Sequence, residues 1–246
     1  MRPPSAAMRI AVIIPVYNHA HFVGEAIESV LAQTRRADRI LCIDDGSKDQ
    51  SLAVCQRYAN RGVQARGREN RGAHNTINEL VQWAKAEGCD WVNVLNSDDR
   101  YLPRKLEMCA AAARANPDKQ VISGRLEVID DSGEVMPPDR PRARWFYGAQ
   151  SLTETGDHSV AELIGKANFI ATTSNVFART DYLLANPFRP YRFNHDYYFL
   201  ASSAWRDVLL LLPEVLMQYR IHGSNTITTK PEPLIREMLR MHLDLY

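Results

Sequence analysis

The stretch Val92-Asn93-Val94-Leu95-Asn96-Ser97-Asp98-Asp99-Arg100 predicts a buried strand that ends in two adjacent carboxylates. Its apolar residues are large or β-branched and lack helical spacing, which is typical of a strand. In an open α/β sheet, ligands bind in the crevice beyond the carboxyl ends of the strands. Asp98 and Asp99 are therefore well placed to hold a divalent cation through their oxygen atoms. The structural alternative is that Asp98 caps the helix expected to begin near Pro103, because Asp is a common N-cap residue.

Strand and helix patterns alternate before this stretch. Strands are expected at residues 10–15, 39–43, around 63 and at 91–95, with helices at 22–31, 52–58 and 77–84 between them. Such alternation predicts βαβ units and a mainly parallel sheet flanked by helices, the α/β class. Right-handed crossovers place the carboxyl ends of the strands along one edge. We therefore expect Tyr17-Asn18, Asp44-Asp45 and Asp98-Asp99 to converge there.

Length and composition indicate a globular protein with a core of its own. A chain of 246 residues can bury about 70% of its unfolded surface. The formal net charge of +1 and the interspersed charges give no sign of nucleic-acid binding. The leucine-rich run at residues 208–212 is far shorter than the ~20 residues of a membrane span. Residues 1–8 have no apolar segment of a signal peptide.

Cysteine usage favours a reducing compartment. The four cysteines lie far apart and form no CxxC pair, which argues against a zinc knuckle or a disulfide framework. They are Cys42, Cys55, Cys89 and Cys109. A cytoplasmic protein with reduced thiols is the simplest interpretation.

Glycine-rich phosphate loops are missing from the turn after the first strand. No glycine occurs between Ile10 and Gly24, so the chain lacks the GxGxxG of a dinucleotide site, and no Walker loop occurs. Phosphates would have to be held by a metal ion and side chains. This fits the acidic pair.

The second half is expected to contain a helix at 106–116, a strand at 120–129, a strand at 172–177, a helix opened by residues 192–196, and two strands at 208–212 and 215–219. Residues 136–150 combine prolines, arginines and aromatic residues, which predicts an irregular loop. This loop is either a lid or acceptor-binding surface, or a solvated loop with an aromatic anchor. Residues 233–246 predict an amphipathic helix.

Six motifs in order resemble the family 2 glycosyltransferases, which have the GT-A fold. They are Ile13-Ile14-Pro15-Val16-Tyr17-Asn18, Asp44-Asp45-Gly46-Ser47, Asn70-Arg71-Gly72, Asn96-Ser97-Asp98-Asp99, His195-Asp196-Tyr197-Tyr198 and Tyr219-Arg220-Ile221-His222-Gly223-Ser224-Asn225. The resemblance covers nearly the whole chain. It implies a single GT-A domain over 1–246, with a nucleotide-binding half at 8–99 and an acceptor-side half with a C-terminal helix at 100–246.

The resemblance also implies the roles of the donor-binding residues. Asp45 would accept a hydrogen bond from the donor base, and an acceptor suits uracil, so a UDP-sugar is favoured. Tyr17 would pack on the base, while Asn18 would organise the loop. Asp98 would bind the ribose hydroxyl or serve as a second metal ligand. The remaining donor contacts would come from Pro15, from Arg71 near the base or diphosphate, and from Arg220 near the diphosphate.

The implied metal is Mg²⁺ or Mn²⁺. By the resemblance Asp99 is the first candidate ligand, with Asp98 and His222 completing the site. The family often has another aspartate where this chain has Asn96. This difference removes one charge and affects metal affinity.

The implied reaction is inverting transfer of a sugar from a nucleotide diphosphate sugar to a hydroxyl acceptor, with Asp196 as the catalytic base. The family commonly has Glu before this aspartate, where this chain has His195. A hexosyltransferase of surface polysaccharide or lipid-linked glycan synthesis is expected. The alternatives are a nucleotide-sugar-binding protein without turnover and, less favoured, a sugar-phosphate nucleotidyltransferase.

Partners and location follow from the same features. The predicted C-terminal helix would pack on the domain or on a second subunit to give a homodimer. Contact with a membrane surface is the weaker alternative, because its charges are mixed in sign. We therefore expect a cytoplasmic protein. The alternative is a cytoplasmic protein that also makes peripheral contact with the inner face of the membrane.

Overall fold

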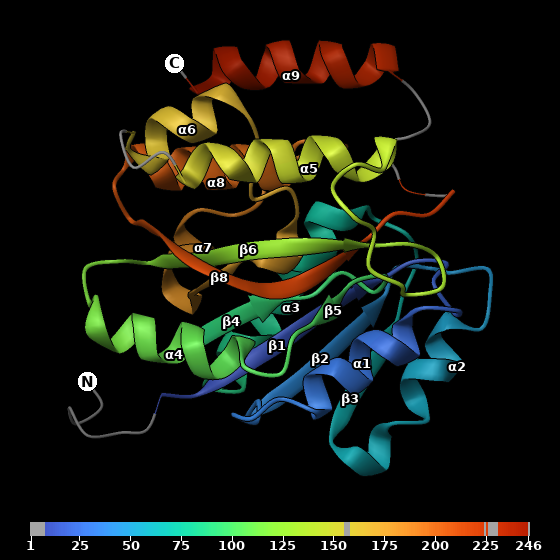
Figure 1. The fold of residues 1–246 in the computed structure, drawn as a ribbon. Coiled ribbons are helices and arrows are strands. Elements are labelled where there is room, and N and C mark those ends of the chain that lie inside the picture. The colour runs from blue at the N-terminus through green and yellow to red at the C-terminus, as the bar shows by residue number, and fades with distance from the viewer. Residues whose placement is uncertain (1–7, 155–157, 224, 226–230, 246) are drawn as a thin grey trace.

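One mixed sheet with helices on both faces organises the computed structural model, which describes residues 8–154, 158–223, 225 and 231–245 (Figure 1). The strands in these ranges are β1 (Ile10–Val16), β2 (Arg39–Asp44), β3 (Val63–Gly67), β4 (Trp91–Val94), β5 (Arg100–Tyr101), β6 (Val121–Ile129), β7 (Phe177–Arg179) and β8 (Leu209–Arg220). The helices are α1 (Val23–Leu31), α2 (Ser51–Gln56), α3 (Ala73–Ala86), α4 (Lys105–Ala115), α5 (Pro141–Ser151), α6 (Val160–Lys166), α7 (Thr180–Ala185), α8 (His195–Trp205) and α9 (Pro231–Leu245).

The parallel part of the sheet contains β3, β2, β1 and β4, in that order. The strand β1 is apolar throughout because helices cover both of its faces. In the register of β1 and β2, Val16 lies opposite Asp44, and Ile13 of β1 lies opposite Val94 of β4. The polar residues that follow β1, β2 and β4 therefore lie on one edge, and the predicted βαβ units are confirmed.

The other half of the sheet is mixed. The strand β7 is antiparallel to β4 and β6, while β6 is parallel to β8 and β5 is antiparallel to β8. The predicted strand at 172–177 is wrong for most of its length, because residues 173–175 form a 3₁₀ turn before β7 begins.

The prediction of two strands at 208–212 and 215–219 is wrong, because β8 is one continuous strand. Its register against β6 shifts between Leu211 and Val215, and Pro213 lies in this irregularity, where its missing N–H costs no ladder hydrogen bond. Gly124 of β6 makes room for the irregular segment. A Cβ there would lie 2.6 Å from Cδ1 of Leu216.

The irregular loop predicted over 136–150 is also wrong for most of its length, because α5 begins at Pro141. Proline is well suited to the first helical position, where its missing N–H is not needed. The helix packs along β6. Tyr147 Oη donates to the carbonyl of Met136 (3.1 Å) and accepts from the amide of Val128 (3.0 Å), while Gln150 bonds both backbone groups of Leu126.

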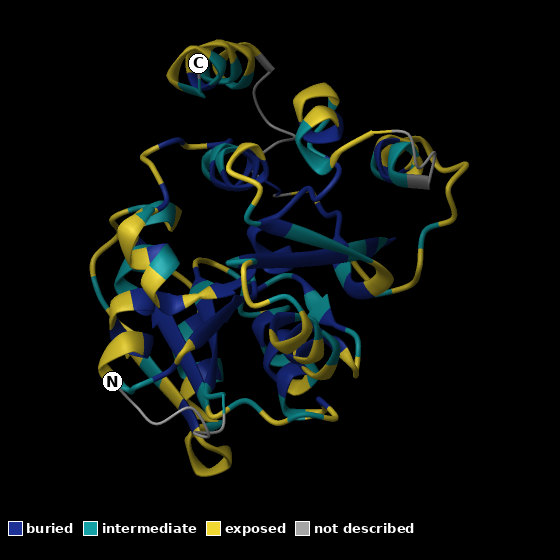
Figure 2. Cartoon of the chain, turned by 90° about the vertical axis from the view of Figure 1, so that its left-hand side faces the viewer, coloured by how far each residue is buried: buried dark blue, intermediate teal, exposed yellow. Residues whose placement is uncertain are grey.

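Buried residues are concentrated in the sheet and on the helix faces that cover it (Figure 2). One apolar core contains residues of α1, α2, α4 and α5, and the other contains residues of α3, α6, α7 and α8. The helix α9 lies outside α6 and α8 in Figure 1 and buries Met241 against the second core. In the described ranges, no helix has the length and apolar character needed to cross a membrane.

Candidate functional site

A cleft of about 780 Å³ opens at the carboxyl edge of the parallel strands. Its volume falls in the usual range of small-molecule sites, about 300–1,000 Å³. The predicted convergence is confirmed for Tyr17-Asn18, Asp45 and Asp98, which all line it. The lining residues are Pro15, Val16, Tyr17, Asn18, His19, Asp45, Asn70, Gly72, Ala73, Thr76, Asn96, Ser97, Asp98, Arg192 and His195.

The loop after β1 forms one wall of the cleft. Asn18 adopts the left-handed conformation (φ 53°), which Asn tolerates better than most residues. Its amide donates to Ser47 Oγ (2.8 Å), and its side-chain oxygen accepts from the amide of Lys48 (2.7 Å). Asn18 thus organises the loop, and it leaves the Tyr17 ring 46% exposed on the cleft.

Asp45 is buried and held by the segment that follows β3. Its carboxylate accepts from the amides of Arg71 (2.8 Å) and Gly72 (2.9 Å) and from the guanidinium of Arg68. A carboxylate has about four acceptor positions, so one remains for a ligand. The side chain of Arg71 is exposed and does not line the cleft, and Arg68 was not predicted from the sequence.

Gly46 allows this segment to approach Asp45. Its φ of +75° lies in the left-handed region, and a Cβ on it would lie 2.8 Å from the amide nitrogen of Asn70. The position therefore requires glycine both for its conformation and for its space.

His19, Asp98 and His222 bring together three ligand atoms within 4.8 Å of one another, which could hold a metal ion. His222 Nε2 lies 3.0 Å from Asp98 Oδ2, and His19 Nε2 lies 4.0 Å from the same oxygen. His19 Nδ1 is hydrogen-bonded to Ser97 Oγ (2.8 Å). Such a bond to the second ring nitrogen orients a metal-binding histidine.

The donor set fits a divalent transition metal. Burial raises the pKa of Asp98, but the hydrogen bond with His222 and the neighbouring His19 outweigh it, so the pKa lies below its ordinary value. The carboxylate is thus ionised, as a ligand must be. The two imidazoles suit a transition metal such as Zn²⁺, whereas the carboxylate alone is the kind of oxygen ligand that Mg²⁺ and Mn²⁺ prefer.

Asp99 lies outside this cluster, although the resemblance made it the first candidate ligand. It is buried and accepts hydrogen bonds from Ser174 Oγ (2.5 Å), the amide of Arg220 (3.0 Å) and Thr172 Oγ1 (3.4 Å). Burial and the charge of Asp98 raise its pKa well above the ordinary value. The structure therefore brings Asp98 and His222 together with His19, which the sequence reasoning had missed.

Arg220 is fully buried beneath the cluster. Its guanidinium donates to the carbonyls of Asp98 (2.8 Å), Asp130 (3.1 Å) and Asp131 (3.0 Å) and to Glu25 Oε2 (2.6 Å). It does not line the cleft. This geometry favours a role in fixing the turn at Asp98 over the predicted contact with a diphosphate.

Asn96 has a structural reason for being an amide. Its Nδ2 donates to Thr172 Oγ1 (2.9 Å), and its Oδ1 accepts from Thr173 Oγ1 (2.7 Å). An aspartate could not donate the first of these bonds. The amide thus joins the acidic loop to the turn before β7.

Asp196 is buried near the start of α8, next to the cleft residue His195. Burial raises its pKa to about 7, although its Oδ1 accepts from the amide of Tyr197 (2.7 Å). Burial also lowers the pKa of His195 to about 4, so this imidazole is neutral at pH 7. A carboxyl group with a pKa near neutrality suits a general base.

Comparison with known proteins identifies the family of this chain. The sequence model of the glycosyl transferase family 2 matches residues 11–172. An uncharacterized glycosyltransferase of Rickettsia prowazekii (strain Madrid E) is 28% identical over 89% of this chain and 66% of its own length. One of Nostoc sp. (strain PCC 7120) is 30% identical over the same shares of both chains. The chain thus spans about two thirds of these relatives.

Solved structures of S. aureus TarS 1–349 are similar in fold. The complex with UDP-GlcNAc matches with a TM-score of 0.68 at 17% identity, over 96% of this chain and 66% of that one. The complex with UDP matches with a TM-score of 0.66 at 18% identity, over 96% and 65% of the two chains. These matches confirm the predicted GT-A fold.

Proposed function

Because the chain belongs to the glycosyl transferase family 2, we propose that it transfers a sugar from a nucleotide diphosphate sugar to a hydroxyl acceptor, with inversion. One observation carries this proposal. A single cleft is lined by the half-exposed Tyr17, by Asp45 with its spare acceptor position, and by His19 and Asp98, which form a cluster with the buried His222. Fold alone would not fix the activity, but this combination of groups supports it.

A uracil nucleotide is the favoured donor. The acceptor position left on Asp45 suits a base N–H, and Tyr17 offers a ring for stacking. TarS, which has a similar fold, has been solved with UDP and UDP-GlcNAc. Pro15 and Asn18 would line the same part of the cleft, and Arg192 adds a positive charge there.

The metal site is proposed at His19, Asp98 and His222, with Mn²⁺ favoured over Mg²⁺. When bound, a divalent ion would act as a Lewis acid for the negative charge of the nucleoside diphosphate leaving group. The protein holds the ligands ready through Ser97 on His19 and Arg220 on the backbone of Asp98.

Asp196 is proposed as the base. Its carboxylate would accept the proton of the acceptor hydroxyl as that oxygen attacks the anomeric carbon, and a single displacement inverts the configuration. His195 would remain neutral and line the cleft beside it.

A thermal-shift panel of UDP-, GDP-, dTDP- and CMP-sugars, each with Mn²⁺ or EDTA, tests this function. A ligand at 100 times its Kd adds about 2.7 kcal/mol to the stability. We expect a UDP-sugar to raise Tm with Mn²⁺ and not with EDTA. No response to any nucleotide would contradict the proposal.

Turnover separates the alternatives. Release of the nucleoside diphosphate and transfer to an acceptor identify a transferase, whereas binding without release identifies a binding protein. Pyrophosphate formed from a nucleoside triphosphate and a sugar phosphate would identify a nucleotidyltransferase. The acceptor is proposed to be a surface glycan or a lipid-linked sugar, by analogy with the family.

One continuous sheet supports a single domain with a donor half and an acceptor half. The four cysteines are free and buried, which supports a cytoplasmic location.

The outer face of α9 exposes Ile235, Leu239 and Leu243, at 57%, 64% and 80%. We propose a second subunit as its partner ahead of a membrane surface, because acidic and basic residues flank this stripe. Mass in solution and sedimentation with anionic vesicles would distinguish the two.

A further inference from the structure

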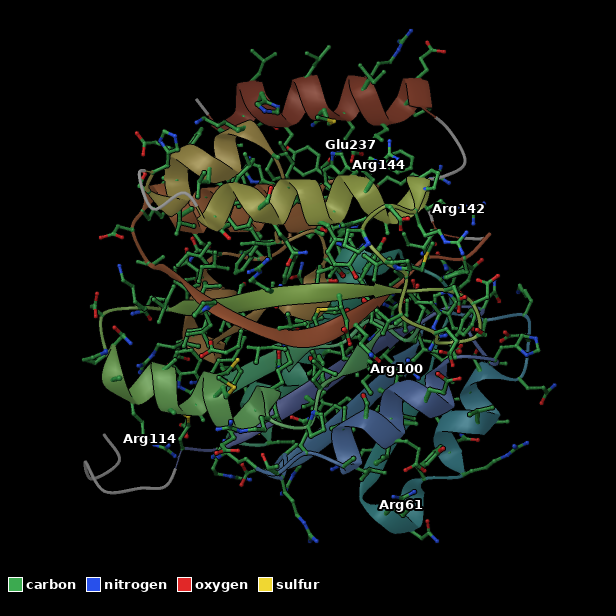
Figure 3. All side chains as sticks on the ribbon, in the orientation of Figure 1. Arg61, Arg100, Arg114, Arg142, Arg144 and Glu237 are labelled. Carbon is green, nitrogen blue, oxygen red and sulfur yellow. The ribbon has the colours of Figure 1, made fainter. Side chains whose placement is uncertain are left out.

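The C-terminal helix α9 holds the loop that leads to the proposed base. Glu237 Oε2 accepts from the amide of Arg192 (2.7 Å). Its Oε1 accepts from the amides of Phe193 (2.6 Å) and Asn194 (2.9 Å) and from Asn194 Nδ2 (3.1 Å). In Figure 3 Glu237 lies on the side of α9 that faces the rest of the molecule. One side chain thus binds three consecutive backbone amides.

These amides come directly before α8, whose second residue is Asp196. The N-terminal residue flanking α8, Asn194, makes no capping hydrogen bond from its own side chain. Glu237 does not replace a cap, which would accept from the second or third helical amide. It binds instead the three amides of the loop that leads into the helix. A carboxylate at this end is also favoured by the helix dipole.

Other contacts keep α9 in place around this interaction. Met241 is fully buried, and Tyr191 Oη donates to Asp244 one turn further along the helix. The Tyr197 and His242 rings pack edge to face at 6.1 Å. The helix therefore contacts residues on both sides of the loop and of Asp196.

We propose that Glu237 is a positioning residue, which fixes residues 192–194 and through them the place of Asp196 and of Arg192 at the cleft. This inference rests on the proposed function for its catalytic consequence. The contact between Glu237 and the loop stands independently of it. No other residue of α9 could replace Glu237, because the three amides converge on its carboxylate alone among the described contacts.

The charge of Glu237 gives the proposal a second readout. Burial is the main cause of the raised pKa of Asp196, and the negative charge of Glu237 adds to it. Two other titratable groups lie close in the structure or the chain. The charge of Asp196 contributes to the raised pKa of Tyr219 of β8, and His195 is the residue before Asp196 in α8. Removal of the Glu237 charge should therefore lower the pKa of the base.

The test compares Glu237→Gln and Glu237→Ala with the control Glu232→Gln, an exposed position on the same helix that pairs with Arg236. Gln retains one oxygen for the three bonds now made to Oε1, so it separates the contact from the folding of α9. We expect hydrogen exchange at amides 192–194 to rise at least tenfold in the Ala variant, less in the Gln variant, and not in the control.

We expect kcat to fall in the same variants in which hydrogen exchange at amides 192–194 rises. A displacement of about 1 Å at a catalytic group can cost about 100-fold, so we expect kcat to fall 10- to 100-fold in the Ala variant, more than the donor KM changes. The acid limb of the pH profile should move to lower pH in both Glu237 variants. Exchange, kcat and pH profile equal to those of Glu232→Gln would overturn the proposal. If the wild type turns over no donor, the proposed function fails, and the exchange result still decides whether Glu237 holds the loop.

Discussion

Asp98 and Asp99 are neighbours in the sequence but have opposite surroundings. Asp98 faces His19 and His222, whereas Asp99 accepts from Ser174 and from the Arg220 amide inside the protein. We expect Asp98→Ala to abolish the stabilisation by Mn²⁺ and nucleotide at a small cost in Tm. Asp99→Ala should instead lower the stability by about 3 kcal/mol or more, because each buried donor left unpaired costs about 1–3 kcal/mol.

Denaturant unfolding with and without Mn²⁺ measures both effects. Asp98→Ala and Asp99→Ala serve as controls for each other, because one should lose the metal response and the other should lose stability. If Asp99→Ala loses the metal response at unchanged stability, the assignment of the two carboxylates is the reverse of the one proposed.

At Asp196 the prediction concerns pH. A pKa raised to about 7 means that the carboxyl is protonated below that pH and cannot accept the proton of the acceptor. We expect kcat/KM to fall tenfold per pH unit below about pH 7 and to be constant above it. Asp196→Asn should lower turnover by about 10²–10⁴ and remove this limb.

Donor affinity is measured over the same pH range as a control. If donor affinity also falls below about pH 7, or if the fall of kcat/KM persists in Asp196→Asn, the group that titrates is not Asp196.

Among the elements, the connection after β2 depends on the close approach of two chain segments. Gly46→Ala should strain the left-handed conformation, at about 1–2 kcal/mol, and also push away the Asn70 backbone. Gly62→Ala is the matched control, because Gly62 has φ +89° and a Cβ there meets nothing within 4 Å. In both variants the free energy of unfolding should fall by the cost of holding an alanine at positive φ.

The difference between the two glycine variants isolates the close approach. We expect Gly46→Ala alone to weaken binding of the nucleotide, because the segment it displaces holds the Asp45 carboxylate. Tm measures the loss of stability in each variant, and the Kd of the nucleotide measures the loss of binding. Equal losses of affinity in both variants would show that the approach at Gly46 does not shape the site.

Elements whose pattern is local were predictable, and elements that depend on distant partners were not. The run Ile10–Val16 is apolar on both faces and leaves few alternatives to a buried strand. In contrast, Pro213 looks like the end of a strand until the shifted register of β6 shows where it is accommodated. The prolines before α5 likewise suggested a loop, whereas Pro141 starts a helix whose Tyr147 and Gln150 bond β6.

For the whole molecule, the sequence predicted which strand ends meet but not which side chains face one another. Parallel strands must end on one edge, so Tyr17, Asp45 and Asp98 were found. The choice between Asp98 and Asp99 depends on the direction of one turn, and Arg220 is buried because Glu25 and three carbonyls surround it. His19 had one signal, its place in the loop directly after the first strand.

The contact made by Glu237 also has a consequence in time. A ribosome that adds about 5–20 residues per second needs roughly 2–8 seconds to extend the chain from Asp196 to Glu237. During synthesis, the residues that line the donor side of the cleft therefore exist before the residue that holds the base loop. We expect the product of a message truncated before Glu237 to bind nucleotide sugar but to turn it over at least 10-fold more slowly than the full chain does.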